Sequence, residues 1–414
     1  MAQLTDDCFA FGGALLPLAE ARARIAELYA CVAGTEPIML SDAVGRVLAA
    51  DAIAAIDLPP QTNSAVDGFA VYFDDLSPDR PTLLPIAGRT AAGQEPGGPL
   101  PRGQARRIFT GAVMPPGPDT VMMQEDCELT DAGVLVQPGI RRGANRRLAG
   151  EDVARGAIAV PGGRRLMPPD IGLIAALGHH QVDVRSALKV AVFSTGDELT
   201  DPPTPLPPGH VYDANRFMLS ALLHRLGARV ADGGILPDDP DATRDALADA
   251  AAWADLVITS GGVSTGEEDH VRTAIQAAGE LTFWRVAIKP GRPVALGAIG
   301  RTPLLGLPGN PVAALITFTA IGRPLFDRLL GAIYLPPARF NVVSGFGYKK
   351  KAGRREYVRV RIGPDGVAQR YPKDGAGILT SLTESDALME LPEEMTILSA
   401  GEAAPCIPLG LLHG

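Results

Sequence analysis

Acidic, hydroxyl-bearing and basic residues recur where short apolar runs end between residues 190 and 311. They are Thr195, Glu198, Asp239, Ser264, Asp269, Lys289 and Arg292. Carboxylates and hydroxyls are oxygen ligands for hard cations such as Mg²⁺, whereas lysine and arginine bind anionic groups. If these side chains converge, they predict a site that handles an anionic ligand.

Glycines lie beside several of these residues, most clearly in Ser260-Gly-Gly-Val-Ser264, where Gly261 and Gly262 leave backbone N–H groups accessible. A helix N-terminus favours an anion by only about 0.3 to 1 kcal/mol. A carboxylate about 4 Å from a phosphate costs roughly 4 kcal/mol at an effective dielectric near 20. Because dipoles alone cannot hold a phosphate beside the acids, we expect Mg²⁺ and the cations of Lys289-Pro-Gly-Arg292 to assist.

The elements predicted around these residues alternate between strand and helix. Strands are predicted over 189–193, 255–259 and 302–307, and helices over 216–226, 241–253, 271–278 and 312–321. Such alternation is typical of a largely parallel sheet that is covered on both faces, with ligands at the carboxyl ends of its strands. Asn310 and Pro311 suit the N-cap and first position of the last helix, whose free N–H groups should face the loop side.

Composition narrows the class of protein. With 414 residues, of which 46% are hydrophobic, the chain can form three or four domains. Its formal net charge of -9 argues against a general nucleic-acid surface. The cysteines, Cys8, Cys31, Cys127 and Cys406, form no C-x-x-C pair, which favours reduced thiols over a zinc site or disulfides. No apolar segment reaches the roughly 20 residues of a membrane span, so we expect a cytoplasmic protein.

Changes in sequence pattern along the chain predict four domains. Apolar residues recur at helical spacing in residues 1–50 and 153–187, which predicts one helical domain in two pieces. Between them, short strand-like runs separated by proline and glycine predict an inserted β domain over residues 51–152. Helices are predicted over 17–29, 41–48 and 169–177. Residues 188–334 form the α/β domain and residues 335–414 a C-terminal β domain. The predicted fold class is α/β and β multidomain, with a central parallel α/β sheet domain.

Several of these residues also have ordinary structural interpretations. Asp67 lies at a turn and could simply stabilise it, and Asp269 could cap the following helix. Lys289 and Arg292 could be solvated loop charges. The neighbouring glycines and prolines indicate shaped loops and favour a ligand role for Asp269, Lys289 and Arg292.

Nine motifs occur in order along the chain. They are Asn63-Ser-Ala-Val-Asp-Gly-Phe-Ala70, Arg107-Ile-Phe-Thr-Gly111, Gly150-Glu-Asp152, Ser194-Thr-Gly-Asp-Glu-Leu199, Tyr212-Asp-Ala-Asn-Arg216, Asp238-Asp-Pro240, Ser260-Gly-Gly-Val-Ser264, Ile288-Lys-Pro-Gly-Arg-Pro293 and Leu307-Pro-Gly-Asn-Pro311. In this order they resemble the molybdopterin molybdenumtransferase family, which includes the MoeA proteins and the E domain of gephyrin. The resemblance runs from about residue 10 to the C-terminus.

This resemblance implies an elongated homodimer that transfers molybdenum from molybdate to adenylyl-molybdopterin, with Mg²⁺ and release of AMP. The product would pass to molybdoenzymes or their chaperones. Catalytic roles fall on Asp67, Glu198, Asp239 and Asp269, of which the last three are also candidate metal ligands. Substrate-binding roles fall on Thr110, Asp152, Thr195, Gly261, Gly262, Ser264, Lys289, Arg292, Arg359 and Ser381. In such dimers the β domain of one subunit reaches the cleft of the other, so Asp67 should serve the other subunit's site.

The chain also departs from the family pattern. Phe69 stands where a tyrosine is usual, His270 where a tyrosine often follows the aspartate, and Leu148 interrupts a longer arginine run. Ala313 stands where family members often carry a serine, so one hydroxyl contact to the oxyanion is expected to be missing.

Two other functions remain open. Molybdopterin adenylyltransferase catalyses the preceding step and its domain resembles residues 190–330, but it typically reads Gly-Gly-Thr-Gly where this chain has Gly261-Gly-Val-Ser264. It also lacks the other three domains. The second alternative is a non-enzymatic scaffold, since the gephyrin E domain also clusters receptors. Glu198, Asp269 and Lys289 favour chemistry over a scaffold role.

Overall fold

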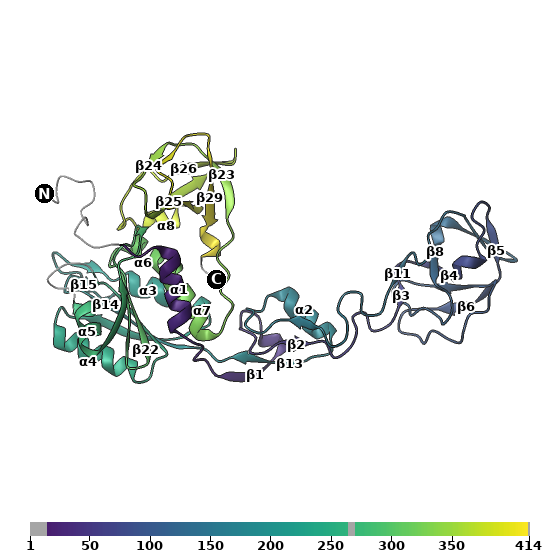
Figure 1. Cartoon of the computed structure of the whole chain (residues 1–414), viewed down its shortest axis with the longest axis horizontal. Helices are drawn as coiled ribbons and strands as arrows, with labels where there is room; N and C mark the ends of the chain where they lie inside the picture. Colours follow the sequence, from purple (N-terminus) through teal and green to yellow (C-terminus); the bar gives the residue numbers. More distant parts are fainter. Residues whose placement is uncertain (1–14, 264–269, 413–414) are drawn as a thin grey trace.

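The computed structural model describes residues 15–263 and 270–412. Figure 1 shows an elongated molecule, with the α/β and C-terminal domains at one end and an inserted β domain at the other. The fold class is α/β and β multidomain, as predicted. Among the described residues, no helix is both long and apolar enough to cross a bilayer.

The α/β domain is built on a six-stranded sheet. Its strands, in spatial order, are β17 (Arg229–Leu236), β14 (Lys189–Thr195), β18 (Leu256–Ser260), β22 (Thr302–Leu307), β21 (Ala295–Ile299) and β19 (Gly279–Trp284). The first four are parallel, and β21 and β19 add an antiparallel edge. The carboxyl ends of β14, β18 and β22 therefore meet at one edge of the sheet, as the sequence predicted.

Helices cover both faces of this sheet because its central strands are apolar on both sides. The helices are α3 (Asn215–Arg225), α4 (Pro240–Ala251), α5 (His270–Ala278), α6 (Pro311–Thr317) and α7 (Arg323–Leu330), with a π-helical turn over Phe318–Gly322 between the last two. Along β14, Val190 and Val192 pack toward α3 and α6, whereas Ala191 and Phe193 pack toward α4 and α5.

The predicted helical domain contains short strands as well as helices. α1 (Leu18–Leu28) packs on α7, and α2 (Pro168–Ala176) lies beside two antiparallel strand pairs. These pairs are β1 (Thr35–Met39) with β13 (Gln181–Arg185) and β2 (Ala52–Ile53) with β12 (Ile158–Val160). The helix predicted over 41–48 is wrong. Only a 3-10 turn forms at Leu40–Asp42, because Gly45 adopts φ +79° and Leu48 donates its N–H to Arg164.

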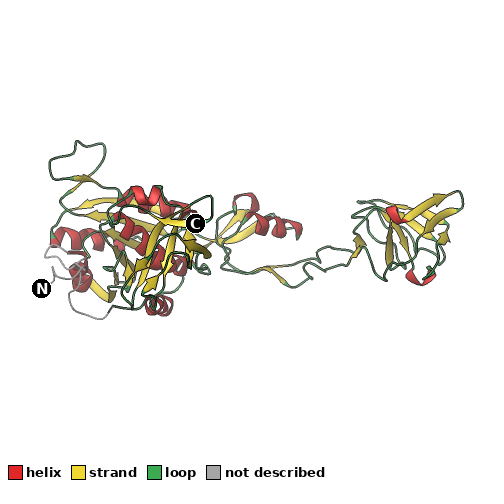
Figure 2. Cartoon of the chain, turned by 90° about the horizontal axis from the view of Figure 1, so that it is seen from above, coloured by secondary structure: helices red, strands yellow, loops and turns green. Residues whose placement is uncertain are grey.

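The inserted β domain contains a four-stranded and a three-stranded sheet. The first has the order β6 (Ile86–Thr90), β7 (Ala105–Ile108), β4 (Gly68–Val71) and β8 (Thr120–Met123), and the second has the order β5 (Thr82–Leu84), β10 (Gly133–Val136) and β9 (Cys127–Thr130). β3 (Asn63–Ser64) pairs with β11 (Arg146–Arg147) at the base of the domain. Two antiparallel chain segments connect this domain to the rest of the molecule (Figure 2), joined by hydrogen bonds between Leu58 and Val153.

The C-terminal domain is a curved sheet that closes on itself, because β25 pairs with both β26 and β27. Its main strands are β23 (Phe340–Ser344), β25 (Arg355–Ile362), β26 (Val367–Arg370), β27 (Ala387–Leu391) and β29 (Ala403–Pro408), with the small pair β24 (Tyr348–Lys349) and β28 (Ile397–Leu398) and the short helix α8 (Thr380–Thr383). β20 (Ile288–Lys289), from the α/β domain, pairs with β25. This pairing fixes the two domains against each other.

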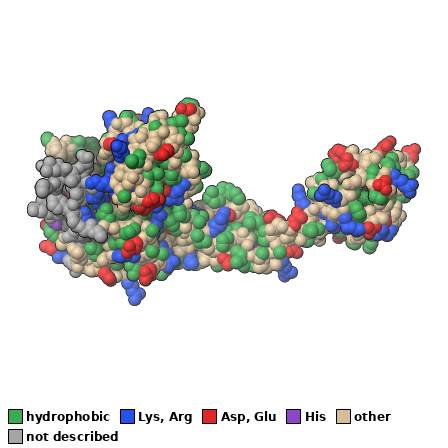
Figure 3. All heavy atoms as spheres, turned by 45° about the horizontal axis from the view of Figure 1, so that its top comes forward, with side chains coloured by type: hydrophobic (Ala, Val, Ile, Leu, Met, Phe, Trp, Pro, Cys, Tyr) green, Lys and Arg blue, Asp and Glu red, His purple; other side chains and the backbone are tan. Residues whose placement is uncertain are grey.

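The surface carries both signs of charge. On the face shown in Figure 3, acidic and basic side chains are interspersed along the described part of the molecule. Such a mixture fits the acidic net charge better than a continuous basic surface for nucleic acid.

Candidate active site

A cavity of about 760 Å³ lies at the carboxyl edge of the central sheet. It is lined by the last residues of β14 and β18 and by the loops that follow β14, β18 and β22, and this lining includes Thr195, Glu198, Gly261 and Gly262. Four of the residues selected from the sequence are therefore brought together. The paired strands β15 (Leu199–Thr200) and β16 (Val211–Tyr212) border the same cavity.

Glycine is required at three positions of this lining. Gly261 has φ +100°, and a Cβ there would lie 2.6 Å from the carbonyl oxygen of Thr195. Gly262 has φ +67°, and its Cβ would lie 2.7 Å from a methyl group of Val271. At Gly196, a Cβ would lie 2.3 Å from the carboxylate of Glu198. The loops thus pack backbone against side chain so closely that only glycine leaves the cavity open.

Buried polar atoms along this cavity lack protein partners. Among the described residues, Ser194 Oγ, Thr195 Oγ1 and Asn215 Oδ1 are buried and accept or donate no hydrogen bond. The amide nitrogen of Asn215 donates to Ser260 Oγ at 2.8 Å and to the carbonyl of Gly309 at 2.6 Å, which fixes its oxygen in place. Buried polar atoms are normally satisfied, so these oxygens indicate a ligand or ordered water.

Asn215 was missed as a site residue, although Tyr212-Asp-Ala-Asn-Arg216 was noted as a motif. The adjacent Arg216 is buried and binds Asp213 at 2.9 Å, together with Asp201 and Asp232. Because these aspartates come from separate segments, Arg216 ties the loop that borders the cavity to α3 and β17. Asn215, which lies between Asp213 and Arg216 in the motif, is therefore held next to this network.

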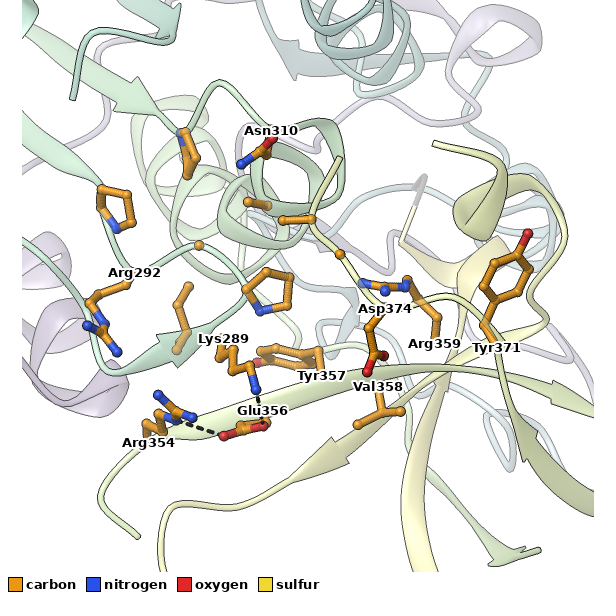
Figure 4. Close-up of a pocket in the computed structure, with 18 of the residues that line it drawn as sticks. Lys289, Arg292, Asn310, Arg354, Glu356, Tyr357, Val358, Arg359, Tyr371 and Asp374 are labelled. Atoms are coloured by element: carbon orange, nitrogen blue, oxygen red, sulfur yellow. Dashed lines mark hydrogen bonds and ion pairs between the residues drawn. The ribbon is translucent and has the colours of Figure 1, made fainter. Parts of the chain in front are cut away.

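A second cavity, of about 310 Å³, adjoins the first and shares Pro293, Pro308 and Asn310 with it. It lies between the α/β and C-terminal domains. Figure 4 shows Asn310 on one side and residues of β25 on the other. The lining includes Lys289, Arg292, Arg354, Arg359 and Arg370, against the acids Glu356 and Asp374. Cations thus outnumber acids by five to two, so the cavity suits an anion.

Arg359 is the most deeply buried of these cations. Its residue is 7% exposed, and Nη2 donates to the carbonyl of Lys373 at 3.5 Å. Among the described residues, its Nε has no partner and its guanidinium forms no ion pair. Burial lowers the pKa of Arg359, an effect that the nearby Asp374 partly offsets. A buried guanidinium in this state is a strong binding group for an oxyanion.

The start of α6 differs from the sequence prediction in one respect. Asn310 and Pro311 occupy the predicted N-cap and first positions, but the Asn310 side chain makes no cap hydrogen bond and lines both cavities instead. The N–H of Val312 was predicted to be free, but it donates to the carbonyl of Ala376 in the C-terminal domain. Ala313 lines the cation-lined cavity without supplying a hydroxyl group.

Comparison with known proteins identifies the family. Three family profiles match in order: the MoeA N-terminal region (domain I and II) over residues 16–178, a probable molybdopterin binding domain over residues 191–328, and the MoeA C-terminal region (domain IV) over residues 341–409. A molybdopterin molybdenumtransferase of Haemophilus influenzae is 37% identical over 406 residues, which cover 97% of this chain and all of that protein. This chain belongs to the molybdopterin molybdenumtransferase family.

Other relatives are similar to this chain over most of its length. A molybdopterin molybdenumtransferase of Nostoc is 36% identical over 89% of this chain and 87% of its own length. A crystal structure of the molybdopterin biosynthesis MoeA protein from Pyrococcus horikoshii OT3 is similar with a TM-score of 0.80 and 28% identity, covering 95% of this chain and all of that one. The family relationship therefore spans all the domains.

Other predicted site residues of this family member lie elsewhere or make structural contacts. Asp239 caps α4, because its carboxylate accepts from the N–H of Ala242 at 2.8 Å, and the neighbouring Asp238 lines the larger cavity instead. Ser381 is buried and its hydroxyl donates to the carbonyl of Ile378, outside the lining of both cavities. Ser264 and Asp269 lie outside the described residues.

Asp67 and Thr110 come together, but in the inserted domain. Both the N–H and the hydroxyl of Thr110 donate to Asp67 Oδ1 at 2.8 Å. These bonds, the backbone one first, lower the pKa of Asp67, whose residue is partly exposed. Asp152 is exposed and lies in the connecting segments, with its N–H bonded to Leu58. The inserted domain lies at the opposite end of the elongated molecule from the α/β and C-terminal domains that form both cavities (Figures 1 and 2).

Proposed function

We propose that this chain transfers molybdenum from molybdate to adenylyl-molybdopterin and releases AMP. The observation that supports this reaction best is the pair of adjoining cavities at the sheet edge. The larger one falls within the usual range of about 300 to 1,000 Å³ for small-molecule sites and suits the nucleotide-bearing substrate. The smaller, cation-lined one suits the oxyanion. Family members of this length are named molybdopterin molybdenumtransferase, which favours this reaction over adenylyl transfer or a scaffold role.

In this proposal the two cavities have separate binding roles. Lys289, Arg292 and Arg359 hold molybdate through charge-assisted hydrogen bonds. The backbone N–H of Gly262 faces the phosphates, since no side chain blocks its approach. The N–H of Gly261 donates to the carbonyl of Leu307 at 2.9 Å and is not accessible, contrary to the prediction from the sequence. Because the cavities share Asn310, an oxyanion in one lies next to a substrate in the other, which shortens the approach of the reacting groups.

We also propose that Mg²⁺ assists this reaction. Within residues 15–263 and 270–412, no group of three acidic, histidine or cysteine side chains could hold a metal. Mg²⁺, however, commonly uses one or two carboxylates plus substrate phosphates, and Glu198 and Asp238 line the cavity beside the buried Thr195 Oγ1. Bound there, Mg²⁺ would neutralise phosphate charge. Asp239 fits this role less well, because its carboxylate caps a helix.

Two variants test the magnesium proposal. Glu198→Gln should raise the Mg²⁺ concentration needed for half-maximal AMP release, because the amide keeps the shape of the side chain and loses its charge. Asp239→Ala should instead lower stability by about 1 kcal/mol through the lost cap and leave the Mg²⁺ dependence unchanged. An unchanged Mg²⁺ dependence in Glu198→Gln would contradict the assignment.

We further propose that the active unit is a homodimer in which Asp67 completes the site of the partner subunit. The support is the position of Asp67 and Thr110 at the far end of their own chain, together with the resemblance to dimeric family members. The compartment is proposed to be the cytoplasm, since the described cysteines, Cys31, Cys127 and Cys406, are free thiols. Molybdoenzymes or their chaperones are the proposed recipients of the product.

Mixed dimers test this arrangement. Asp67→Asn and Glu198→Gln subunits are co-expressed with different tags so that about half of the dimers are mixed, and AMP release is measured at a Mg²⁺ concentration at which neither homodimer is active. If Asp67 acts in trans, each mixed dimer has one intact and one doubly damaged site, and molybdate-dependent AMP release recovers to about a quarter of wild type. No recovery in verified mixed dimers would place Asp67 outside the partner's site. No molybdate-dependent AMP release by the wild-type protein would refute the transferase proposal itself.

A further inference from the structure

Glu356 is a buried carboxylate in the wall of the cation-lined cavity. Its residue is 1% exposed, and it belongs to β25 of the C-terminal domain. Arg354 Nε donates to its Oε1 at 2.7 Å, and the Tyr348 hydroxyl donates to its Oε2 at 2.8 Å. The same Oε2 lies 3.4 Å from Lys289 Nζ. Figure 4 shows the Lys289 and Arg354 side chains converging on this carboxylate.

Strand pairing brings Lys289 and Glu356 together. β20 pairs with β25 in parallel, with Lys289 opposite Glu356 in the register. The lysine side chain remains 51% exposed, whereas the glutamate is enclosed. The carboxylate is thus held by two other donors, and the ammonium is the partner that is free to turn toward the cavity.

We propose that Glu356 is the resident counter-ion of Lys289 and competes with the incoming oxyanion for it, so that Glu356 limits oxyanion affinity. The inference rests on the proposed oxyanion role of this cavity. Lys289 is neutralised when the cavity holds no anion, and an oxyanion must share it with Glu356 or draw it away. Arg359 forms no ion pair among the described residues, so no carboxylate holds it by direct contact.

The direction of the effect follows from the charges. Molybdate is a dianion, and a buried carboxylate in the same wall repels it. Glu356→Gln removes this repulsion and releases Lys289, while the amide oxygen can still accept from Arg354 and the amide nitrogen can donate to the Tyr348 hydroxyl. Both consequences favour the oxyanion, so the substitution should tighten its binding. A purely structural role predicts the opposite, because damage to the wall loosens the cavity.

The test is direct binding of molybdate alone to the full-length protein, measured by titration calorimetry at fixed ionic strength. Glu356→Gln should lower the Kd about tenfold or more, because one like charge close to a dianion is worth at least that factor. In turnover, KM for molybdate should fall without a rise in kcat. An unchanged or higher Kd in the folded variant overturns the inference alone. No molybdate binding by the wild-type protein overturns it together with the proposed oxyanion role.

Glu390 provides a matched control. It is 4% exposed on the neighbouring strand β27 and is likewise bound by two arginines and a tyrosine, Arg339, Arg355 and Tyr357. It lines neither cavity. Glu390→Gln should therefore lower the melting temperature without changing the Kd for molybdate. A tightening as large as that of Glu356→Gln would overturn the inference, since the effect would then not depend on contact with Lys289.

A second measurement applies even if Glu356→Gln folds poorly. Because Glu356 already neutralises Lys289, Lys289→Met should weaken molybdate binding by a smaller factor than Arg359→Met. An equal or larger loss in Lys289→Met would show that Glu356 does not reduce the effect of the lysine and would overturn the inference.

Discussion

Replacing Arg359 with methionine should reduce oxyanion binding while leaving the fold intact. The guanidinium is buried and, among the described residues, forms no ion pair, so the folded protein bears its desolvation cost with little compensation. Methionine has a similar length and no charge to desolvate. Replacing a buried charge in this way is often neutral or stabilising, so we expect the free energy of unfolding to stay within about 1 kcal/mol or to rise.

The expected loss of binding follows from the contacts that the guanidinium can make. A hydrogen bond to a charged group contributes about 1.5 to 3 kcal/mol. Arg359 has at least one donor, Nε, that is unused among the described residues. Losing one such bond to molybdate corresponds to a Kd increase of about 10- to 150-fold.

The assay combines molybdate titration with thermal denaturation. Arg361→Met is the control, because Arg361 lies two residues further along β25, where its half-exposed side chain pairs with Glu384 outside both cavities. The control should change neither the Kd nor the melting temperature appreciably, since exposed ion pairs contribute little. A fall of several degrees in the melting temperature of Arg359→Met, with wild-type molybdate affinity, would refute this reasoning and make Arg359 a structural residue.

Two further predictions concern the larger cavity and the inserted domain. Gly261→Ala should destabilise the protein by about 1 to 3 kcal/mol and impair nucleotide binding, because the φ of Gly261 is unfavourable for alanine and the added Cβ would meet Thr195. The control is Gly300→Ala, where φ is +60° and no atom lies near the added Cβ, so the loss of unfolding free energy in denaturant should be smaller. Equal losses in the two variants would contradict the steric argument. Thr110→Val should raise the depressed pKa of Asp67 toward its ordinary value in a carbon-13 NMR titration, because the hydroxyl bond is lost and the backbone bond remains. The ionised carboxylate stabilises the fold above its unfolded-state pKa, and this stabilisation is lost as the pH falls through the folded-state pKa. In Thr110→Val this stabilisation should be smaller. An unchanged pKa of Asp67 would contradict the role of the hydroxyl.

Local sequence patterns were sufficient for the elements of the α/β domain. Apolar runs gave β14, β18 and β22 because central parallel strands are buried on both faces and need continuous apolar sequence. Glycines after these strands predicted the loops that line the larger cavity, because only glycine adopts the positive φ angles of these loops without strain. The helix predicted over 41–48 failed because periodicity alone could not show that its second half pairs with residues 164–165.

The tertiary structure decided which side chains face the cavities. Asp238 and Asp239 are equivalent by composition, and only the start of α4 at Pro240 assigns Asp239 to the cap and Asp238 to the lining. Glu356 is 67 residues from Lys289 in sequence, and only the register between β20 and β25 makes them partners. Sequence determines the type of side chain and its local backbone, because both depend on near neighbours. Which distant groups meet depends on strand register and on the path of the chain between domains, which no local pattern contains.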